Sequence, residues 1–335
     1  MSLRTLAAIL AVGLFSLSPV LRAADHAVIL LYHHVSQETP ASTSVTPERF
    51  TAHLDYLEDH GFTVMPLQLL LEKALAGGPL PDNAVAITFD DAYRSVFTEA
   101  APRLADRDWP FTVFLASQPL DDQVPGYMSW QQARELLAMG ASIGGHSHSH
   151  DYLARRRSGE SDAQWAQRID DEIDRNRERI RAELQVDIQA FAYPFGEYNS
   201  QLKGALSRRQ LLGLAQQSGA VGAVTDPLQI PRFPMASGQD SLQRLRQGVH
   251  SRPLPVVQER VDDGVLSITL SGEALAGLAC FASSGEALSL HQMGERRYAV
   301  DLPPTRGGRN KVNCTAPSSE GAGEFYWYSY LWLGD

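Results

Sequence analysis

Short apolar segments alternate with longer amphipathic segments over about the first three quarters of the chain. The apolar segments are nearly continuous in Val, Ile, Leu, Phe and Ala, a pattern typical of parallel strands covered on both faces. They span residues 27–33, 62–65, 85–89, 111–116, 141–145, 189–193, 220–224 and 229–233. Alternating strands and helices in this number predict an α/β fold, a distorted or incomplete (β/α) barrel. An open doubly wound sheet is the alternative that spacing leaves.

Several helix starts are readable between these strands. Thr46-Pro47 places a capping residue before a proline at the first helical position. Ser129 is followed three residues later by Gln132, which is a capping-box pattern. Residues 161–184 repeat apolar positions at helical spacing and are otherwise rich in Arg, Asp and Glu. We therefore expect an outer helix whose charged face is solvated.

The pattern changes near residues 252–255, which read Arg-Pro-Leu-Pro. Strand-like segments follow at 265–270, 287–291, 298–302 and 325–333, without an amphipathic helix. They predict a small C-terminal β-sandwich over residues 253–335, either structural or carbohydrate-binding. Within the last segment, Tyr326 and Tyr328 share one face, and Phe325 and Trp327 share the other. One face belongs to the core, and the other is a packing surface or a sugar-stacking platform.

The N-terminus has the pattern of a secretory signal. Arg4 precedes an apolar run at 6–17, and Ala23-Ala24 supplies small residues for cleavage. We expect residues 1–24 to be removed and the protein to be periplasmic or secreted, without a stable membrane span. A retained membrane anchor is the alternative.

The net charge and the cysteines indicate which classes of partner to exclude and whether a disulfide forms. The net charge is −10 and the chain has three lysines, which argues against a nucleic-acid or anionic-membrane partner. Cys280 and Cys314 are the two cysteines. In an exported protein such a pair predicts a disulfide, with two buried free thiols as the alternative.

Reactive side chains follow four of the predicted strands. His33-His34, Asp90-Asp91, the segment 146–150 and Pro194-Phe195-Gly196 each stand at a strand end. The C-terminal ends of barrel strands meet on one face, where active sites collect. Two carboxylates and two histidines on that face suggest a metal-dependent hydrolase.

The aspartate and histidine motifs have both chemical and ordinary explanations. Adjacent aspartates at a strand end point in different directions, so one can bind a metal while the other acts as a base. An isolated Asp-Asp pair is also explained as a helix cap. His146 and His150 have a spacing that lets two imidazoles converge on one ion, which with a carboxylate gives an open catalytic zinc site. A solvated histidine-rich loop is the alternative, and we assign His148 to it.

These motifs together resemble those of the polysaccharide deacetylases, carbohydrate esterase family 4, which share the NodB homology domain. Thr88-Phe89-Asp90-Asp91 and the segment 146–150 resemble the first two motifs, and the segment 191–196 looks like the third. The resemblance spans about residues 28–235 and implies a distorted (β/α) barrel over 25–252. It also implies removal of N- or O-acetyl groups with a divalent metal.

The resemblance carries roles over to individual residues. It implies that Asp90 is the catalytic base and that the Phe195 N–H helps to hold the oxyanion. The implied metal ligands are Asp91, His146 and His150, and the implied groove residues are Tyr193, Pro194 and Phe195. The metal is expected to be zinc, with cobalt, nickel or iron able to use the same ligands.

Two departures from the family pattern matter. Ala192 stands near the usual place of an arginine that braces the base; Arg232 is a candidate substitute, and an ordinary surface arginine is the alternative. The late histidine motif is absent, and His33-His34 stands at the first strand end instead. This order is similar to the permuted deacetylases of poly-β-1,6-N-acetylglucosamine, which implies that His33 is the general acid. The reverse assignment to His34 stays open.

The sequence therefore predicts a metal-dependent hydrolase that removes N-acetyl groups from an N-acetylglucosamine polysaccharide or oligosaccharide. The alternatives are a peptidoglycan or chitin deacetylase, an O-acetyl esterase, or a non-catalytic carbohydrate-binding protein on the same scaffold.

Overall fold

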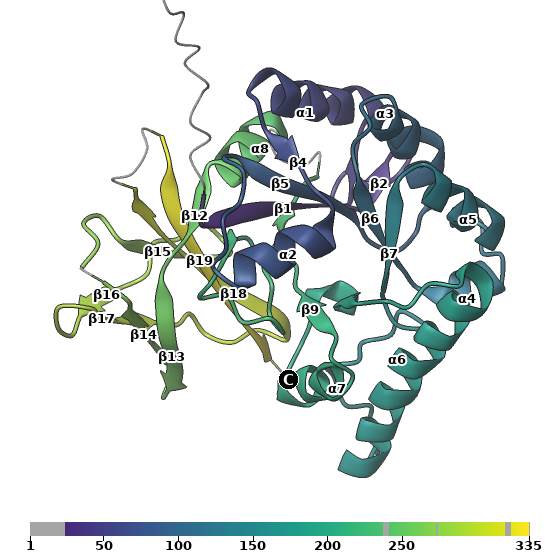
Figure 1. Cartoon of the computed structure of the whole chain (residues 1–335). Helices are drawn as coiled ribbons and strands as arrows, with labels where there is room; N and C mark the ends of the chain where they lie inside the picture. The colour runs from purple at the N-terminus through teal and green to yellow at the C-terminus, as the bar shows by residue number, and fades with distance from the viewer. Residues whose placement is uncertain (1–23, 237–240, 273, 319–322, 335) are drawn as a thin grey trace, which may run out of the picture.

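A computed structural model describes residues 24–236, 241–272, 274–318 and 323–334 (Figure 1). The predicted signal sequence at 1–24 lies outside this part, apart from its last residue. Within the described ranges, no helix is both long and apolar enough to cross a membrane.

Parallel strands form the wall of the N-terminal barrel (Figure 1). In spatial order they are β1 (His26–Tyr32), β5 (Ala84–Phe89), β6 (Phe111–Leu115), β7 (Ala141–Gly145), β8 (Ala190–Ala192) and β9 (Leu212–Leu214). β4 (Thr63–Val64) pairs with the start of β5. Nearly every residue of β1, β5 and β6 is buried, as expected for strands covered on both faces. The fold is the predicted distorted (β/α) barrel.

A short segment after β9 bridges the gap between β9 and β1. Ile230 pairs with Leu214 of β9, and β11 (Phe233–Pro234) pairs in parallel with β1. The predicted strand at 229–233 is therefore mostly a connecting segment that carries Arg232 between two pairing points. The predicted parallel strand at 220–224 is also wrong: β10 (Val221–Gly222) is short and antiparallel to β1.

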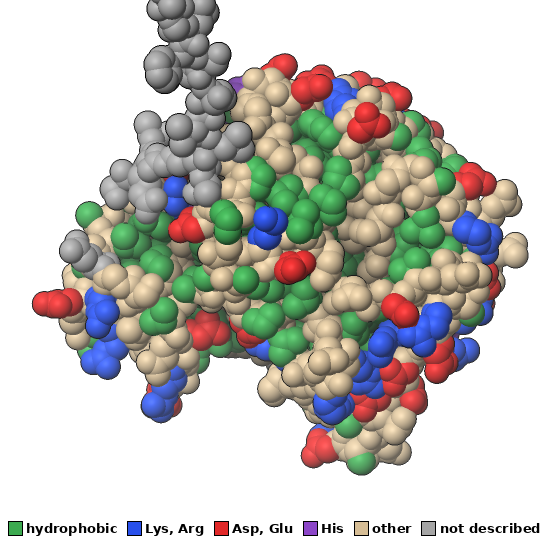
Figure 2. All heavy atoms as spheres, in the orientation of Figure 1, with side chains coloured by type: hydrophobic (Ala, Val, Ile, Leu, Met, Phe, Trp, Pro, Cys, Tyr) green, Lys and Arg blue, Asp and Glu red, His purple; other side chains and the backbone are tan. Residues whose placement is uncertain are grey.

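Helices cover the outside of the barrel. They are α1 (Pro47–Asp59), α2 (Leu67–Leu75), the π-helical turn η1 (Val96–Ala100) continuing into α3 (Ala101–Ala105), α4 (Ser117–Asp121), α5 (Trp130–Ala138), α6 (Asp162–Leu184), α7 (Ser200–Arg208) and α8 (Ser241–Val249). The capping predictions are confirmed: Thr46 accepts from Arg49 N, and Ser129 and Gln132 form a reciprocal capping box. Figure 2 shows mixed basic and acidic side chains over the exposed side of α6, as its composition predicted.

Two four-stranded sheets form the C-terminal region. One has the order β12 (Ser251–Pro253), β19 (Phe325–Gly334), β18 (Gly308–Pro317), β15 (Ala279–Ala282), and the other has the order β13 (Val256–Asp262), β14 (Val265–Leu270), β17 (Arg297–Asp301), β16 (Leu290–Gln292). A separate apolar cluster lies between them and includes Leu266, Ile268, Val300 and Val312. The predicted all-β character is confirmed, although β12, β13, β15 and β18 were missed.

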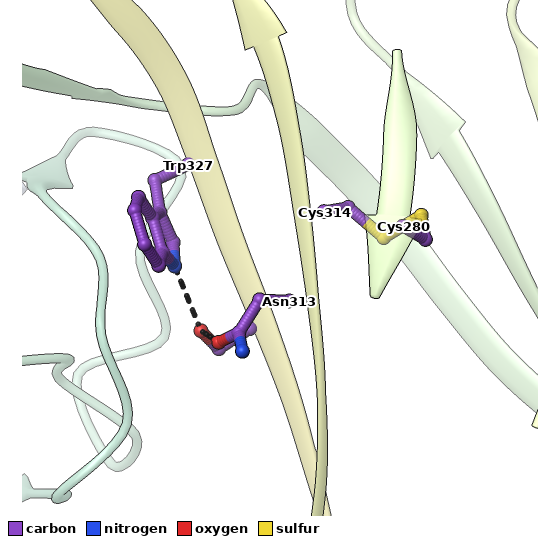
Figure 3. The surroundings of a disulfide bond; sticks show 5 residues. Cys280, Asn313, Cys314 and Trp327 are labelled. Carbon is purple, nitrogen blue, oxygen red and sulfur yellow. Dashed lines mark hydrogen bonds between the residues drawn. A yellow bond between two sulfur atoms is a disulfide. The ribbon is translucent and has the colours of Figure 1, made fainter. Parts of the chain in front are cut away.

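The first of these sheets uses its two faces differently. Tyr326 and Tyr328 of β19 pack against the sandwich core, whereas Trp327 and Leu331 pack against the core of the barrel. The face of β19 that carries Trp327 is therefore largely a surface for packing between the two regions. Of the two alternatives for the face outside the sandwich core, packing or sugar stacking, the structure favours packing. Cys280 and Cys314 face each other on β15 and β18 and form the predicted disulfide (Figure 3).

Candidate active site

The two adjacent aspartates leave β5 in different directions. Asp90 N–H donates to Tyr32 O at 2.9 Å, which extends the pairing of β1 and β5 by one residue. Asp91 then turns to a positive φ of 72°. Both side chains are buried, but Asp90 contacts Arg232 and Asp91 contacts two histidines. The turn thus separates two carboxylates that are neighbours in sequence.

Asp91, His146 and His150 converge on one point. Asp91 Oδ1 lies 3.0 Å from His146 Nε2 and 3.1 Å from His150 Nε2. One ligand atom from each residue lies within 4.8 Å of the other two. Burial raises the pKa of Asp91, but the neighbouring imidazoles lower it more, so that the net pKa is well below its usual value.

The donor chemistry of these three residues fits a cation. His146 Nδ1 lies 2.7 Å from the carbonyl oxygen of Ala192, so this nitrogen carries the proton and Nε2 presents a lone pair. His146 Nε2 and Asp91 Oδ1 are buried and have no hydrogen-bond partner within the part of the chain described. Such atoms face each other stably only when positive charge lies between them, as a proton or a metal ion. A His₂Asp set with room for further ligands is typical of a catalytic zinc site.

The inner face of α6 holds the loop that carries both histidines. Asn176 Oδ1 accepts from His146 N–H at 3.2 Å, and its Nδ2 donates to Leu115 O at 2.9 Å. Glu172 accepts from the backbone N–H and the hydroxyl of Ser149 at 2.8 and 2.7 Å. The predicted solvated helix therefore also orients the site. The signal available in the sequence was a buried-face position occupied by a polar residue, Asn176.

The residues between the two histidines serve the loop. Ser147 Oγ accepts from His150 N–H at 2.9 Å, and so it orients that histidine through the backbone. His148 points away, and its Nδ1 lies 2.9 Å from Ser117 Oγ. The prediction that His148 is solvated is wrong, because its side chain is buried. The glycine before His146 lets α6 approach, since a Cβ on Gly145 would lie 2.7 Å from Asn176 Oδ1.

Asp90 and Arg232 form a fully buried ion pair. Arg232 Nη1 donates to Asp90 Oδ1 and Nη2 donates to Oδ2, both at 2.8 Å, and neither side chain is exposed. Arg232 Nε donates to Ala215 O at 2.9 Å. Burial raises the pKa of Asp90, but the charges of Arg232 and His146 outweigh it and lower the net pKa. The residue that the sequence suggested as a substitute brace thus lies against the Asp90 carboxylate.

His33 and His34 face different surroundings. Gln216 Nε2 lies 3.2 Å from His33 Nε2 and donates to Asp90 Oδ2 at 3.4 Å. Burial lowers the pKa of His33, and the carboxylates of Asp91 and Asp90 oppose this shift. His34 stacks on Tyr93 at 3.5 Å, and burial lowers the pKa of His34 to about 4. Of the two histidines, His33 is therefore the one linked to Asp90, because both contact the same Gln216 amide nitrogen.

The third motif forms a tight turn beside the histidines. Phe195 has a φ of 58°, and its ring lies 4.5 Å from the ring of His150 and 3.8 Å from that of Tyr152. Tyr193 is buried in the barrel core with its hydroxyl donating to Leu228 O at 2.8 Å. Pro194 is also buried. Phe195 is therefore the half-buried side chain of this turn, whereas Tyr193 and Pro194 support it from inside.

Comparison with known proteins gives a family and related structures. Residues 77–213 match the family described as polysaccharide deacetylase. Poly-β-1,6-N-acetyl-D-glucosamine N-deacetylase of Escherichia coli K12 is 26% identical over 211 residues, which cover 51% of this chain and 31% of that protein. The chain thus spans about a third of the length of this relative.

Two solved structures share the barrel fold. IcaB from Ammonifex degensii has a TM-score of 0.57 at 25% identity and covers 67% of this chain and 96% of its own. The deacetylase PplD of Streptococcus pyogenes, solved with acetate, has a TM-score of 0.60 at 20% identity and covers 68% and 99%.

Proposed function

Because this chain carries a polysaccharide deacetylase domain, we propose that it is a metal-dependent hydrolase that removes N-acetyl groups from a polymer containing N-acetylglucosamine. The observation that carries the proposal is the pairing of two different carboxylate environments at one strand end. Asp91 faces two imidazoles, while Asp90 faces a guanidinium. One carboxylate is thereby suited to hold a metal and the other to act as a base that stays ionised.

Asp91, His146 and His150 would hold the metal. A divalent ion bound there would polarise the acetyl carbonyl and make water acidic enough to lose a proton near neutral pH. Zinc suits these ligands, and cobalt, nickel or iron could use them as well.

Asp90 is the proposed base. Its lowered pKa keeps it ionised at neutral pH, so it can accept the proton of the attacking water. Arg232 holds both carboxylate oxygens by charge-assisted bonds and fixes the direction in which the free lone pairs point. The same guanidinium limits the basicity of Asp90, which suits a proton acceptor that must later release its proton.

The proposed roles of the other residues follow from their places. The Phe195 N–H stabilises the negative charge that develops on the acetyl oxygen, and the turn at positive φ fixes the direction of this N–H. His33 protonates the departing amine, after which acetate and a glucosamine unit remain. Tyr193 and Pro194 support the turn from the barrel interior.

The proposed substrate rests on the sequence resemblance and on the named relatives. The permuted position of His33 and the similarity to a poly-β-1,6-N-acetyl-D-glucosamine N-deacetylase favour a β-1,6-linked polymer. A binding-only role fits less well, because a buried ion pair of Asp90 and Arg232 is costly to maintain without a use for the carboxylate.

We further propose an exported protein whose deacetylase barrel spans residues 25–252 and whose β-sandwich spans 253–335. The signal-like N-terminus and the disulfide between Cys280 and Cys314 support export, since disulfides persist in oxidising compartments.

The test is acetate release from β-1,6- and β-1,4-linked N-acetylglucosamine oligomers in parallel. Each is assayed after chelation and again after zinc or cobalt is restored, with Asp90→Asn as a control that keeps the metal ligands. We expect metal-dependent release, faster from the β-1,6-linked oligomer. Faster release from the β-1,4-linked oligomer would shift the proposal to chitin or peptidoglycan, and no release with metal bound would contradict it.

A further inference from the structure

A residue of the C-terminal sandwich reaches the catalytic turn of the barrel. Arg309, the second residue of β18, donates from Nη1 to the carbonyl oxygen of Phe195 at 2.6 Å and to Gln216 Oε1 at 3.1 Å. Both acceptors belong to the loops that follow β8 and β9. The guanidinium therefore joins two catalytic loops from outside the barrel.

The contact also fixes which way round the Gln216 amide lies. Arginine only donates, so the amide turns its oxygen towards Arg309 and its nitrogen towards the barrel. That nitrogen lies 3.2 Å from His33 Nε2 and 3.4 Å from Asp90 Oδ2. A chain of contacts thus runs from the sandwich through one glutamine to the proposed acid and base.

The backbone around this contact leaves room for the arginine. Gly196 has a φ of 66°, and a Cβ at this position would lie 2.7 Å from Arg309 Nη1 and 2.5 Å from Gln216 Cβ. Any side chain at 196 would therefore displace Arg309 or Gln216. A Cβ on Gly308 would lie 3.1 Å from Arg155 Nη2, so the start of β18 also lies close against the barrel.

Neighbouring contacts hold the same loop to the sheet. Gln217 Nε2 donates to Ser329 O at 3.0 Å, and Ser329 Oγ donates to Ser218 O at 2.6 Å. These bonds dock the two regions, but they do not reach His33 or Asp90. Ser329 is therefore a matched control for a contact that docks without orienting the site.

We propose that Arg309 is a positioning residue through which the β-sandwich completes the active site of the barrel. It holds the Gln216 amide against His33 and Asp90, and it holds the carbonyl of the turn that presents the Phe195 N–H. The inference rests on the proposed deacetylase function for its kinetic consequence, but the orientation of Gln216 is a separate observable.

The first test follows the Gln216 side-chain amide by NMR in the metal-loaded full chain labelled with ¹⁵N-glutamine. Gln216→Ala identifies the signals. We expect a well-dispersed pair of NH₂ signals that collapses to averaged positions in Arg309→Ala and persists in Ser329→Ala. Unchanged Gln216 signals in Arg309→Ala would overturn the proposal whether or not the protein is active.

The second test measures acetate release from the substrate preferred by the unaltered protein. We expect Arg309→Ala to lower kcat about tenfold, with KM and metal content unchanged. A tenfold loss lies at the low end of the effects expected when a hydrogen bond from a charged group is removed. Arg309→Lys should recover part of the loss, and it provides a second variant if Arg309→Ala folds poorly. Arg309→Ala/Gln216→Ala should be no slower than Gln216→Ala.

The outcomes separate the two proposals. Additive losses in the double variant, or an equal fall in kcat for Ser329→Ala, would reduce Arg309 to a docking contact and overturn the inference. If Gln216 depends on Arg309 but the unaltered chain releases no acetate, the positioning role stands and the deacetylase proposal fails.

Discussion

The barrel and the sandwich differ in what they bury. The barrel encloses ionised and hydrogen-bonding groups at its strand ends, where Asp90 and Arg232 are wholly buried. The sandwich encloses apolar side chains and a disulfide, while pairs such as Arg260 and Asp262 stay exposed at 73% and 70%. A buried charged group needs an oppositely charged or hydrogen-bonding partner to offset its desolvation, whereas buried apolar side chains need only complementary packing. This difference supports the proposals that the barrel carries the chemistry and that the sandwich contributes packing contacts and Arg309.

The largest expected effect comes from breaking the buried ion pair. Arg232→Ala leaves the Asp90 carboxylate buried without its partner, which should lower the free energy of unfolding by about 3 to 5 kcal/mol. Denaturant unfolding measures this change, and acetate release should be lost with it. Arg260→Ala, which removes an exposed pair, should leave the unfolding midpoint unchanged.

A second variant separates charge from shape at the same place. Asp90→Asn/Arg232→Met replaces the pair by groups without net charge and should be more stable than Arg232→Ala. If Arg232→Ala is as stable as the unaltered chain, the buried pair in the barrel contributes no more to stability than an exposed pair in the sandwich.

The disulfide should give the next largest effect. Cys280 and Cys314 are 34 residues apart, and chain-entropy arguments assign roughly 3 to 4 kcal/mol to closing such a loop. Cys280→Ser/Cys314→Ser should therefore lower the unfolding midpoint while metal stoichiometry at low temperature stays unchanged. Loss of metal from the folded variant would contradict this expectation, since it would show that the sandwich influences the proposed metal ligands of the barrel.

Leu331 tests the packing between the two regions. It lies on the face of β19 directed towards the barrel and belongs to the barrel core cluster. Leu331→Ala should cost about 2 to 3 kcal/mol through lost burial and a residual cavity. Tyr326 lies on the opposite face of the same strand, and Tyr326→Phe provides a control that keeps the apolar contact. An equal loss of stability in both variants would argue against the division of faces.

The smallest expected effect concerns Ala92, next to the proposed metal ligand Asp91. Ala92 is buried at a φ of 65°, a conformation that favours glycine. Ala92→Gly relieves backbone strain but loses a buried methyl group and raises the entropy of the unfolded chain. We expect a net change below about 1 kcal/mol, whereas Ala92→Val should destabilise clearly because a β-branched residue fits this conformation poorly. A large stabilisation by glycine would mean that the relief of backbone strain outweighs both the lost methyl contact and the added entropy of the unfolded chain.

The barrel and the candidate metal ligands could be predicted from the sequence because their sequence patterns are local. The apolar run that forms β5 ends in Asp90-Asp91, and the run that forms β7 ends in the histidine loop, so chemistry and strand could be read together. β9 was missed because its core is three residues long, and β10 was assigned the wrong direction because apolar content does not encode strand orientation. Short strands depend on neighbours that are distant in sequence.

The residues that support the site were harder to predict. Asn176 looked like part of a charged helix, and Gln216 and Arg309 belong to no motif. Their roles arise from contacts between segments separated by 30 to 183 residues, so no periodicity or spacing signals them. Arg232 was a candidate only because the resemblance required an arginine near Asp90.

The most direct test of the central claim is to measure bound metal and acetate release for Asp90→Asn and Asp91→Asn side by side. We expect that Asp90→Asn keeps about one metal per chain, because the proposed ligands are intact, but loses turnover. Asp91→Asn should lose both metal and turnover. Loss of metal from Asp90→Asn with retention in Asp91→Asn would reverse the roles of the two aspartates and contradict the account.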